Sequence, residues 1–217
     1  MGKDSILNKK QEIILGEFRD SVKLSSFYFT GGTALSEYYL QHRESVDLDF
    51  FSKAEFDPQI ILETINSWSK KHSFKIQSEF IDPTYRYIFE FEDGERLKVD
   101  FAKYPYSNLK EYEIFDGVRV DSFYDISVNK FLTINQRTEV KDFVDLYFIL
   151  EKYNFWQLKD GVQAKFNIEI EPFLMAGDYM KVEGFENLPK MHKELDLRTL
   201  KDFFTNQAKK LSGDLVK

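Results

Sequence analysis

Residues 29–51 have the sequence FTGGTALSEYYLQHRESVDLDFF, which carries the most specific structural information in the chain. Its aromatic start ends at Gly31-Gly32-Thr33, where a strand pattern gives way to a helical one that reaches about Gln41. Glycines at such a junction let backbone N–H groups approach an anion, and a helix N-terminus adds partial positive charge. A glycine turn followed by a threonine cap gives the same pattern, so both interpretations stay open at this point.

The stretch ends in a second predicted strand that carries two aspartates. Alternation along a strand places Asp47 and Asp49 on one face, and Val46, Leu48 and Phe50 on the other. Two neighbouring carboxylates repel each other, and a hard cation such as Mg²⁺, which prefers carboxylate oxygens and substrate phosphates, would neutralise them. A solvated face of an edge strand is the alternative.

A third carboxylate lies in a later strand pattern. Residues 96–101 read RLKVDF, in which apolar residues alternate with Lys98 and Asp100. If this strand lies beside the first, three acids converge and form a site suited to two-metal nucleotidyl transfer. A single strand aspartate is usually structural, so the assignment of Asp100 depends on its neighbours.

The remaining pattern predicts an α+β fold. Helical spacing covers residues 6–22 and a segment from Asp57-Pro58 to about Lys71, and strand patterns with Asp-Gly turns fill residues 74–120. From Ser122 onward the pattern is helical. We therefore expect an α+β domain over residues 1–121 and a helical region, packed against it, over residues 122–217.

Together these motifs resemble the nucleotidyltransferase-like AbiEii toxin family, which are bacterial proteins of the DNA polymerase β-like nucleotidyltransferase superfamily. The superfamily pattern is Gly-Gly or Gly-Ser, a helix, Asp-x-Asp and a later strand aspartate, matched here by Gly31-Gly32, Asp47, Asp49 and Asp100. The family's helical signature is similar to a second set of positions, namely Lys130, Arg137, Lys141, Asp142 and Asp145. The match covers about residues 27–150, and it implies a nucleotidyltransferase-type mixed sheet flanked by helices.

The helical signature also has a physical interpretation. On a helix from Phe123, Lys130 and Arg137 lie within an apolar stripe, where an unpaired charge is costly. A cleft lined by carboxylates and phosphates would accommodate these cations. An intramolecular ion-pair network with Asp142 and Asp145 of the next helix would do so equally well.

The resemblance implies an enzyme that moves a nucleoside monophosphate from an NTP to a hydroxyl of an RNA or of a protein. Among RNA acceptors, tRNA is the first to test. Its cofactor would be Mg²⁺ in a two-ion site, or Mn²⁺ in its place. We expect Asp47, Asp49 and Asp100 to hold the metal. Asp100 would also accept the proton of the attacking hydroxyl or help the metal lower the pKa of that hydroxyl. Lys130 would neutralise charge as pyrophosphate leaves.

Further residues are expected to bind the nucleotide. The turn formed by Gly31, Gly32 and Thr33 would cradle the triphosphate, and Arg43 and Ser45 would either hold a phosphate or fix the loop. The helical positions complete this set: Lys130, Arg137, Lys141, Asp142 and Asp145. The resemblance to the family also implies that this protein is the toxin of a bacterial toxin–antitoxin or phage-defence pair, with a separately encoded antitoxin.

Two other classes of function fit the same fold. A nucleotidyltransferase fold can hold a nucleotide or a partner without chemistry, although a degenerate site would be expected to have lost Asp47 or Asp49. A purely structural or interaction protein would bind no nucleotide at all. Calorimetry with ATP and GTP identifies the first class by nucleotide binding without turnover. The second class would show neither nucleotide binding nor a Mg²⁺-dependent thermal shift.

Composition excludes several classes of protein. With 42% hydrophobic residues, 22 Phe and 12 Tyr, the chain is too apolar for intrinsic disorder. Its 30 basic and 37 acidic residues give a net charge of −7, unlike that of a protein that coats nucleic acid. The absence of cysteine excludes disulfides and thiolate metal sites, and the three histidines lack ligand spacing. No apolar run is long enough to cross a membrane, so we expect a cytoplasmic protein.

Overall fold

The structure, a computed structural model, describes residues 5–213 and divides into two compact units. Most of the first unit precedes residue 123, and most of the second follows it. However, the second unit also takes in two short segments that the sequence pattern did not indicate, His42–Glu44 and Asn108–Lys110.

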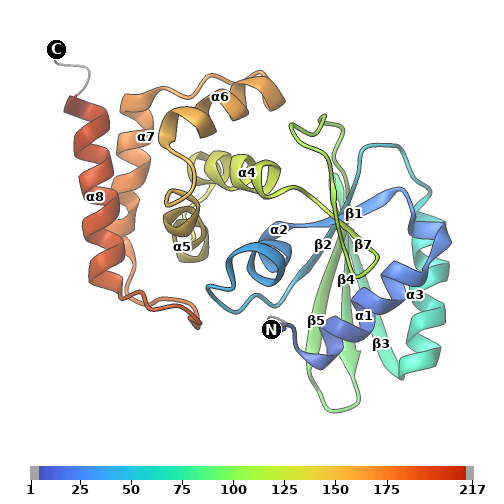
Figure 1. Cartoon of the computed structure of the whole chain (residues 1–217). Helices are drawn as coiled ribbons and strands as arrows, with labels where there is room; N and C mark the ends of the chain where they lie inside the picture. The colour runs from blue at the N-terminus through green and yellow to red at the C-terminus, as the bar shows by residue number, and fades with distance from the viewer. Residues whose placement is uncertain (1–4, 214–217) are drawn as a thin grey trace. The chain divides into compact units, whose positions relative to one another are not determined.

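The first unit is built on a mixed seven-stranded sheet, as expected for an α+β fold (Figure 1). The strand order is β3-β4-β5-β2-β1-β7-β6. The strands are β1 Phe27–Thr30, β2 Leu48–Ser52, β3 Phe74–Ile81, β4 Thr84–Phe91, β5 Arg96–Lys103, β6 Glu113–Phe115 and β7 Val118–Val120. Only the β2–β5 and β1–β7 pairs are parallel among these strands, and the others are antiparallel.

Helices cover both faces of this sheet. Figure 1 shows α1 and α3 on one face and α2 on the other. The helical segments are α1 Lys9–Asp20, the 3₁₀ turn η1 Val22–Leu24, α2 Gly31–Ala34, the π-helix η2 Leu35–Leu40 and α3 Pro58–His72. Under α1, Phe18 stacks on Phe50 with ring centroids 4.0 Å apart, and Phe50 in turn packs on Phe101 at 5.2 Å. Because side chains alternate along each strand, this aromatic core leaves the other face to the polar residues of β2 and β5.

Local sequence explains where α3 begins and which face it buries. The Asp57 side chain accepts a hydrogen bond from the Gln59 N–H, and Pro58 occupies the first turn, where its missing N–H costs nothing. Ile61, Ile65 and Trp68 follow on the buried face. The predicted helix is therefore confirmed, and it ends at His72.

Strand β2 begins at Leu48, two residues later than the pattern indicated. The last residue of β1, Thr30, pairs with Asp49, and the chain then turns into α2, so no ladder partner exists for Asp47. The expectation that Val46 joins the apolar face is wrong, because this side chain is 62% exposed. Asp47 therefore lies in the loop just before the strand.

The second unit is helical. Its elements are α4 Phe123–Gln136, α5 Val140–Ile149, α6 Phe155–Phe166, α7 Pro172–Tyr179, the 3₁₀ turn η3 Met180–Gly184 and α8 Leu197–Gly213. Helices α4 and α6 approach so closely that a Cβ at Gly161 would overlap the Val128 side chain. Asp125 holds the Asn108–Lys110 segment, because its carboxylate accepts the backbone N–H groups of residues 109 and 110 at 2.9 Å each.

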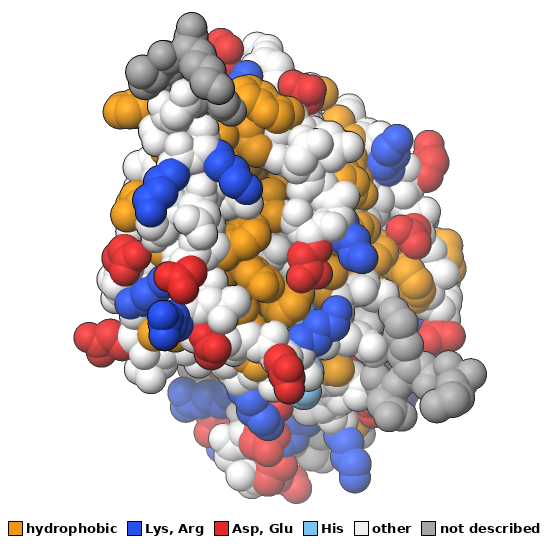
Figure 2. All heavy atoms as spheres, turned by 60° about the vertical axis from the view of Figure 1, so that its left-hand side comes forward, with side chains coloured by type: hydrophobic (Ala, Val, Ile, Leu, Met, Phe, Trp, Pro, Cys, Tyr) orange, Lys and Arg blue, Asp and Glu red, His pale blue; other side chains and the backbone are white. Residues whose placement is uncertain are grey.

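The surface on the α8 side of the molecule carries charges of both signs. Figure 2 shows Lys and Arg interspersed with Asp and Glu around a strip of apolar side chains. No extended positive area is present among the described side chains of that face. Nor does any helix between residues 5 and 213 have the length and apolar character needed to cross a membrane.

Candidate active site

A row of polar residues crosses four strands of the first unit. Thr30 of β1 pairs with Asp49 of β2, Asp49 with Asp100 of β5, and Asp100 with Arg86 of β4. Cross-strand partners project to the same face, and neighbouring strands lie about 4.8 Å apart. The sheet therefore brings Asp49 and Asp100 side by side, although they lie 51 positions apart in the sequence.

The Asp49 carboxylate lies against the glycine turn. Gly31 has φ of 77°, a left-handed conformation that favours glycine, and a Cβ at this position would overlap the Asp49 carboxylate. The two halves of the predicted motif therefore meet, one from the turn after β1 and one from β2. Glycine is needed here for its conformation and also for the space that it leaves.

The loop before β2 is fixed from two sides. The buried Thr33 hydroxyl donates a hydrogen bond to the Asp47 carbonyl and lies 2.9 Å from the Ser45 hydroxyl. From α1, the Gln11 side-chain amide donates to the Ser45 carbonyl at 2.8 Å. Of the two roles expected for Ser45, these contacts support fixing of the loop.

Two cations, to which the sequence pattern gave no role, pair with the acids. The Arg86 guanidinium donates to both carboxylate oxygens of Asp100, with Nε–Oδ1 and Nη2–Oδ2 distances of 3.1 Å each. Lys98 Nζ lies 2.5 Å from Asp47 Oδ2 and 3.9 Å from Asp100 Oδ2. The hydrogen bond to Asp100, together with nearby negative charge, raises the pKa of Arg86. A two-residue turn at Asp93-Gly94 would place Tyr87 opposite Asp100. In the structure the loop spans residues 92–94, with the Phe91 N–H donating to the Glu95 carbonyl, and this register places Arg86 there instead.

The donor set has the right chemistry for a hard divalent cation. Asp47, Asp49 and Asp100 offer only carboxylate oxygens, the ligands that Mg²⁺ prefers, and the Gly31 turn leaves open backbone beside Asp49. In the arrangement found for residues 5–213, however, no three His, Asp or Glu side chains are placed to hold one ion. Asp47 and Asp100 are instead directed at Lys98 and Arg86.

The other predicted residues gather in a second cluster, inside the second unit. Asp145 of α5 is fully buried and accepts hydrogen bonds from His42 Nε2 at 2.7 Å and from Arg43 Nε and Nη2 at 2.7 and 2.8 Å. Lys130 Nζ of α4 lies 2.7 Å from Asp145 Oδ2 and 2.9 Å from Asp142 Oδ1. These contacts hold the His42–Glu44 segment against α4 and α5. They support a structural role for Arg43, which is only 3% exposed.

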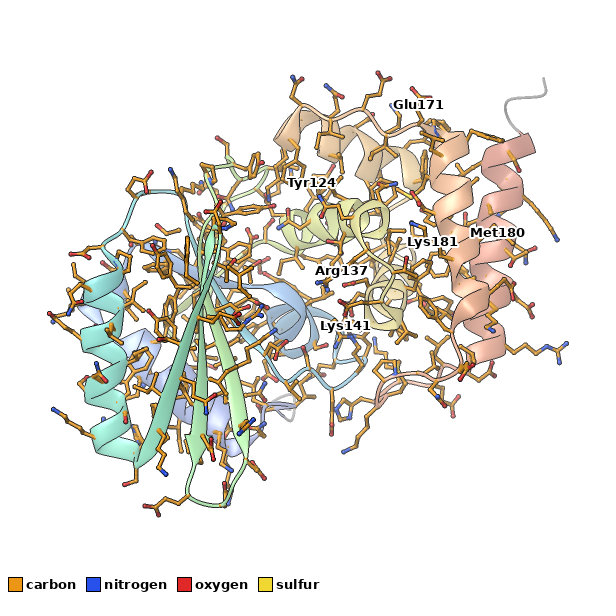
Figure 3. The ribbon with its side chains drawn as sticks, turned by 180° about the vertical axis from the view of Figure 1, so that it is seen from behind. Tyr124, Arg137, Lys141, Glu171, Met180 and Lys181 are labelled. Atoms are coloured by element: carbon orange, nitrogen blue, oxygen red, sulfur yellow. The ribbon has the colours of Figure 1, made fainter. Side chains whose placement is uncertain are left out.

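Arg137 and Lys141 lie at the α4–α5 junction, at the edge of this cluster (Figure 3). Arg137 forms a fork on Asp142, with Nε–Oδ2 and Nη2–Oδ1 distances of 2.7 and 3.0 Å. Lys141 Nζ lies 3.0 Å from a carboxylate oxygen of Glu139. The geometry thus supports the ion-pair network that the sequence left as an alternative, and a nucleotide-binding role for these residues stays a prediction.

Opposing effects set the protonation of this cluster. Burial alone would raise the pKa of Asp145, but the charges of Lys130 and Arg43 and the hydrogen bonds from His42 and Arg43 outweigh it. The pKa of Asp145 is consequently held well below its usual range. For His42 burial is the larger effect, and it lowers the pKa despite the hydrogen bond to Asp145.

We predict that His42 makes stability depend on pH near neutrality. Its pKa is lower in the folded than in the unfolded chain, so below about pH 6.5 the unfolded chain binds the proton first and stability falls. The expected slope approaches about 1.4 kcal/mol per pH unit. Urea unfolding between pH 5 and 7 measures it, and His42→Gln should remove it while the exposed His192→Gln should not. Equal slopes in all three proteins would contradict the prediction.

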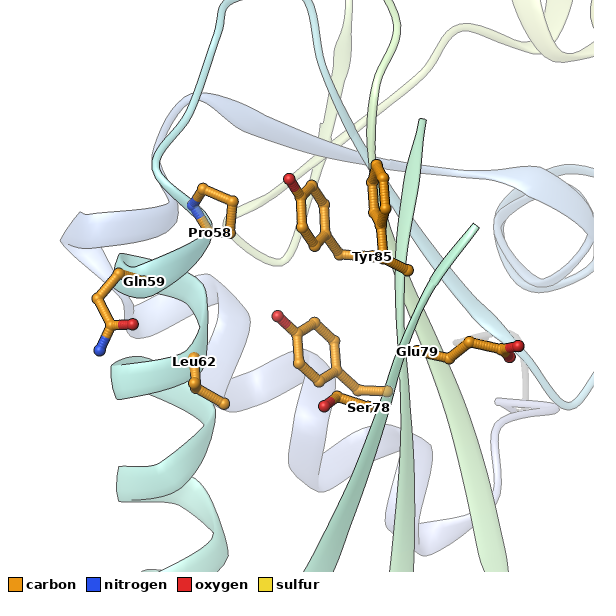
Figure 4. A pocket seen from close by; sticks show the side chains of 8 residues that line it. Pro58, Gln59, Leu62, Ser78, Glu79 and Tyr85 are labelled. Carbon is orange, nitrogen blue, oxygen red and sulfur yellow. The ribbon is translucent and has the colours of Figure 1, made fainter. Parts of the chain in front are cut away.

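A separate small pocket lies between α3 and the β3–β4 hairpin (Figure 4). Its volume is about 230 Å³, below the roughly 300 Å³ at which small-molecule sites begin. Tyr85 points from β4 toward Pro58, whereas Glu79 points away to the other side of the hairpin. The pocket is lined by Pro58, Gln59, Leu62, Ser78, Glu79, Phe80, Tyr85 and Tyr87. No predicted site residue is among them, so we do not assign the function to this pocket.

Comparison with known proteins decides the family. The sequence matches the family described as "Nucleotidyl transferase AbiEii toxin, Type IV TA system" over residues 13–211. The chain belongs to this family. The expectation from the motifs is thereby confirmed, and the AbiEii match continues beyond residue 150 to residue 211, a stretch in which we recognised no motif.

Relatives of this AbiEii protein share its length and its fold. The uncharacterized protein aq_aa25 of Aquifex aeolicus (strain VF5) is 31% identical over 219 residues, which span 94% of this chain and 96% of that protein. MenT4, a nucleotidyltransferase toxin of Mycobacterium tuberculosis H37Rv, has a similar structure, with a TM-score of 0.61 and 16% identity over 94% of this chain and 82% of that one. JHP933 of Helicobacter pylori has a TM-score of 0.58 and 21% identity, over 95% and 90% of the two chains. The AbiEii protein is therefore a nucleotidyltransferase by family and by fold.

Proposed function

We propose that this AbiEii protein transfers a nucleoside monophosphate from an NTP to a hydroxyl of an RNA acceptor, with a divalent cation bound at Asp49 and Asp100. The observation that carries the proposal is the position of Asp49, which lies beside Asp100 and against the Gly31 turn. Family membership supports the reaction type. We choose tRNA, which carries a free 3′ hydroxyl, as the first acceptor to test.

The proposed reaction is a displacement at phosphorus. The acceptor hydroxyl oxygen forms a bond to the α-phosphorus of the NTP, and the bond from that phosphorus to the bridging oxygen breaks. Pyrophosphate leaves with the electron pair of the broken bond, and the hydroxyl proton passes to a carboxylate, for which Asp100 is our candidate. Asp47, Asp49 and Asp100 would hold Mg²⁺ or Mn²⁺. The ion would neutralise negative charge on the phosphates and lower the pKa of the attacking hydroxyl.

The chain's own residues position the substrate in this proposal. Backbone N–H groups of the turn formed by Gly31, Gly32 and Thr33 cradle the triphosphate. Thr33 and Ser45 hold the loop that carries Asp47, so that this carboxylate stays near the strand that carries Asp49. We propose that in the cell this protein acts as the toxin of a toxin–antitoxin pair or of a phage-defence system, and that a separately encoded antitoxin opposes it.

The test is a transfer assay with purified protein, each labelled NTP in turn, Mg²⁺ and total tRNA. We expect label on RNA, which EDTA prevents and Mn²⁺ restores. The Asp47→Ala plus Asp49→Ala variant should leave the RNA unlabelled. Transfer that survives in this variant would refute the metal assignment, whereas label found only on protein would replace the RNA acceptor by a protein one.

A second candidate function is nucleotide binding without transfer. The pairing of Asp47 with Lys98 and of Asp100 with Arg86 favours it, because these ion pairs complete the sheet face without a metal. Calorimetry with ATP and GTP separates the two candidates. Binding without label on any acceptor would support this second function.

A further inference from the structure

Arg86 engages the whole carboxylate of Asp100. Its Nε and Nη2 atoms each lie 3.1 Å from a different oxygen of that carboxylate, and the two residues are direct cross-strand partners on β4 and β5. The Asp100 side chain is only 8% exposed and that of Arg86 is 30% exposed. A planar fork of this kind is the stronger class of protein hydrogen bond and is geometrically specific.

Lys98 is a second cation that offsets the negative charge of the aspartates on this face of the sheet. It lies two positions from Asp100 on the same face of β5, and it contacts Asp47 as well as Asp100. Asp49, the cross-strand neighbour of Asp100 on β2, lies against Gly31. Two of the three proposed metal ligands are therefore paired with cations from their own sheet.

The fork takes one lone pair on each Asp100 oxygen, and its positive charge repels a second cation at that side of the carboxylate. Arginine keeps its charge at any accessible pH, so Arg86 does not release Asp100 by losing a proton. A cation that binds both oxygens of Asp100 on that side displaces the guanidinium. The displaced guanidinium keeps its charge and needs a new anion, and a phosphate matches its fork as well as a carboxylate does.

We propose that Arg86 is an exchange residue: it holds Asp100 in the metal-free protein and moves to a phosphate of the nucleotide when a divalent cation takes Asp100. This inference rests on the proposed function, since it requires a cation at Asp100. It extends that function by naming a binding residue for the triphosphate. It also explains why the three acids do not form a metal site in the present arrangement.

The first experiment measures Mn²⁺ binding without nucleotide, by electron paramagnetic resonance and calorimetry. Removing the fork with Arg86→Gln should tighten Mn²⁺ binding about tenfold, because a hydrogen bond to a charged group no longer competes for Asp100. Arg86→Lys, which keeps the charge but not the fork, should give an intermediate affinity. Arg96→Gln is the matched control: Arg96 lies on β5, on the same strand and face as Asp100, but pairs with Glu90, so Mn²⁺ binding should not change.

The second experiment measures binding of a non-hydrolysable NTP analogue in saturating Mg²⁺. Here Arg86→Gln should bind about tenfold more weakly than the wild type, so the two affinities change in opposite directions. A merely structural Arg86 would weaken both, and unchanged or weaker Mn²⁺ binding in Arg86→Gln would overturn the inference. If that variant does not fold, as judged by circular dichroism, the same comparison with Arg86→Lys decides.

The outcomes also separate this inference from the function on which it rests. If the wild type shows no Mn²⁺ binding, or if its Mn²⁺ binding persists in Asp49→Asn, the proposed metal site is refuted, and the inference is refuted with it. If the wild type binds Mn²⁺ through Asp49 but Arg86→Gln does not bind it more tightly, only the inference fails.

Discussion

Replacing Gly31 by alanine is expected to reduce nucleotide transfer by about 10³-fold. The new Cβ would overlap the Asp49 carboxylate, so either the turn or the acid must move. Alanine is also strained at a φ of 77°. Displacing Asp49 separates it from Asp100, its neighbour on β5, and a loss of several kcal/mol of transition-state stabilisation corresponds to the stated factor.

The matched control for this prediction is Gly94→Ala. Gly94 has a φ of 82°, so alanine suffers a similar backbone strain there, but a Cβ at this position meets no atom within 4 Å. Gly94→Ala should therefore lose about 1 kcal/mol of stability from backbone strain alone, Gly31→Ala should lose at least as much, and only Gly31→Ala should lose transfer. Initial rates of label transfer at saturating NTP measure the difference. Comparable rates in the two variants would mean that the contact between the turn and Asp49 has no part in the reaction.

Replacing Asp145 by asparagine should destabilise the second unit by about 3–5 kcal/mol. The side chain keeps its size, so the loss reflects charge and not a cavity. Without the carboxylate, Arg43 and Lys130 keep their positive charges in a buried setting and lose the anion that they share. An uncompensated buried charge is among the most costly single defects in a folded protein.

Urea or thermal unfolding, monitored by circular dichroism, measures this loss. Asp160→Asn is the control, because Asp160 belongs to α6 of the same unit and is exposed, so its replacement should change stability by about 0.5 kcal/mol or less. A loss below about 1 kcal/mol for Asp145→Asn would show that the cluster is solvated and not a buried network.

The acidic face of the sheet was largely predictable from the sequence. Alternation places Asp49 and Asp100 opposite the apolar residues of their strands, and the family resemblance makes those strands neighbours. What alternation does not give is the partner of each acid. Arg86 faces Asp100 only because the β4–β5 hairpin closes with a three-residue loop over 92–94, whereas a two-residue turn at Asp93-Gly94 would place Tyr87 there.

The environment of Lys130 shows where local pattern stops being informative. Helical periodicity correctly places it in an apolar stripe and requires a partner for its charge. Whether that partner is a bound phosphate or a protein carboxylate depends on the position of α5, which periodicity does not determine. In the fold, Asp142 and Asp145 provide the partner.

Two other features carry no local signal. The helix that follows Gly31 continues as a π-helix over Leu35–Leu40, and its end at Gln41 has φ of 48°, a conformation that the residue type does not reveal. The three residues after it are hydrophilic and read as an ordinary loop. The burial of two of them, His42 and Arg43, becomes visible only when Asp145, about 100 positions later, is in place.

The short segments His42–Glu44 and Asn108–Lys110 make the helical half of the gene inseparable from the rest. A truncated product starting at Phe123 would contain every helix from α4 to α8, yet it would lack His42 and Arg43, which complete the buried surroundings of Asp145. Recombination at that apparent boundary would therefore yield an incomplete fold. We therefore expect the coding sequence on the two sides of residue 123 to be inherited together.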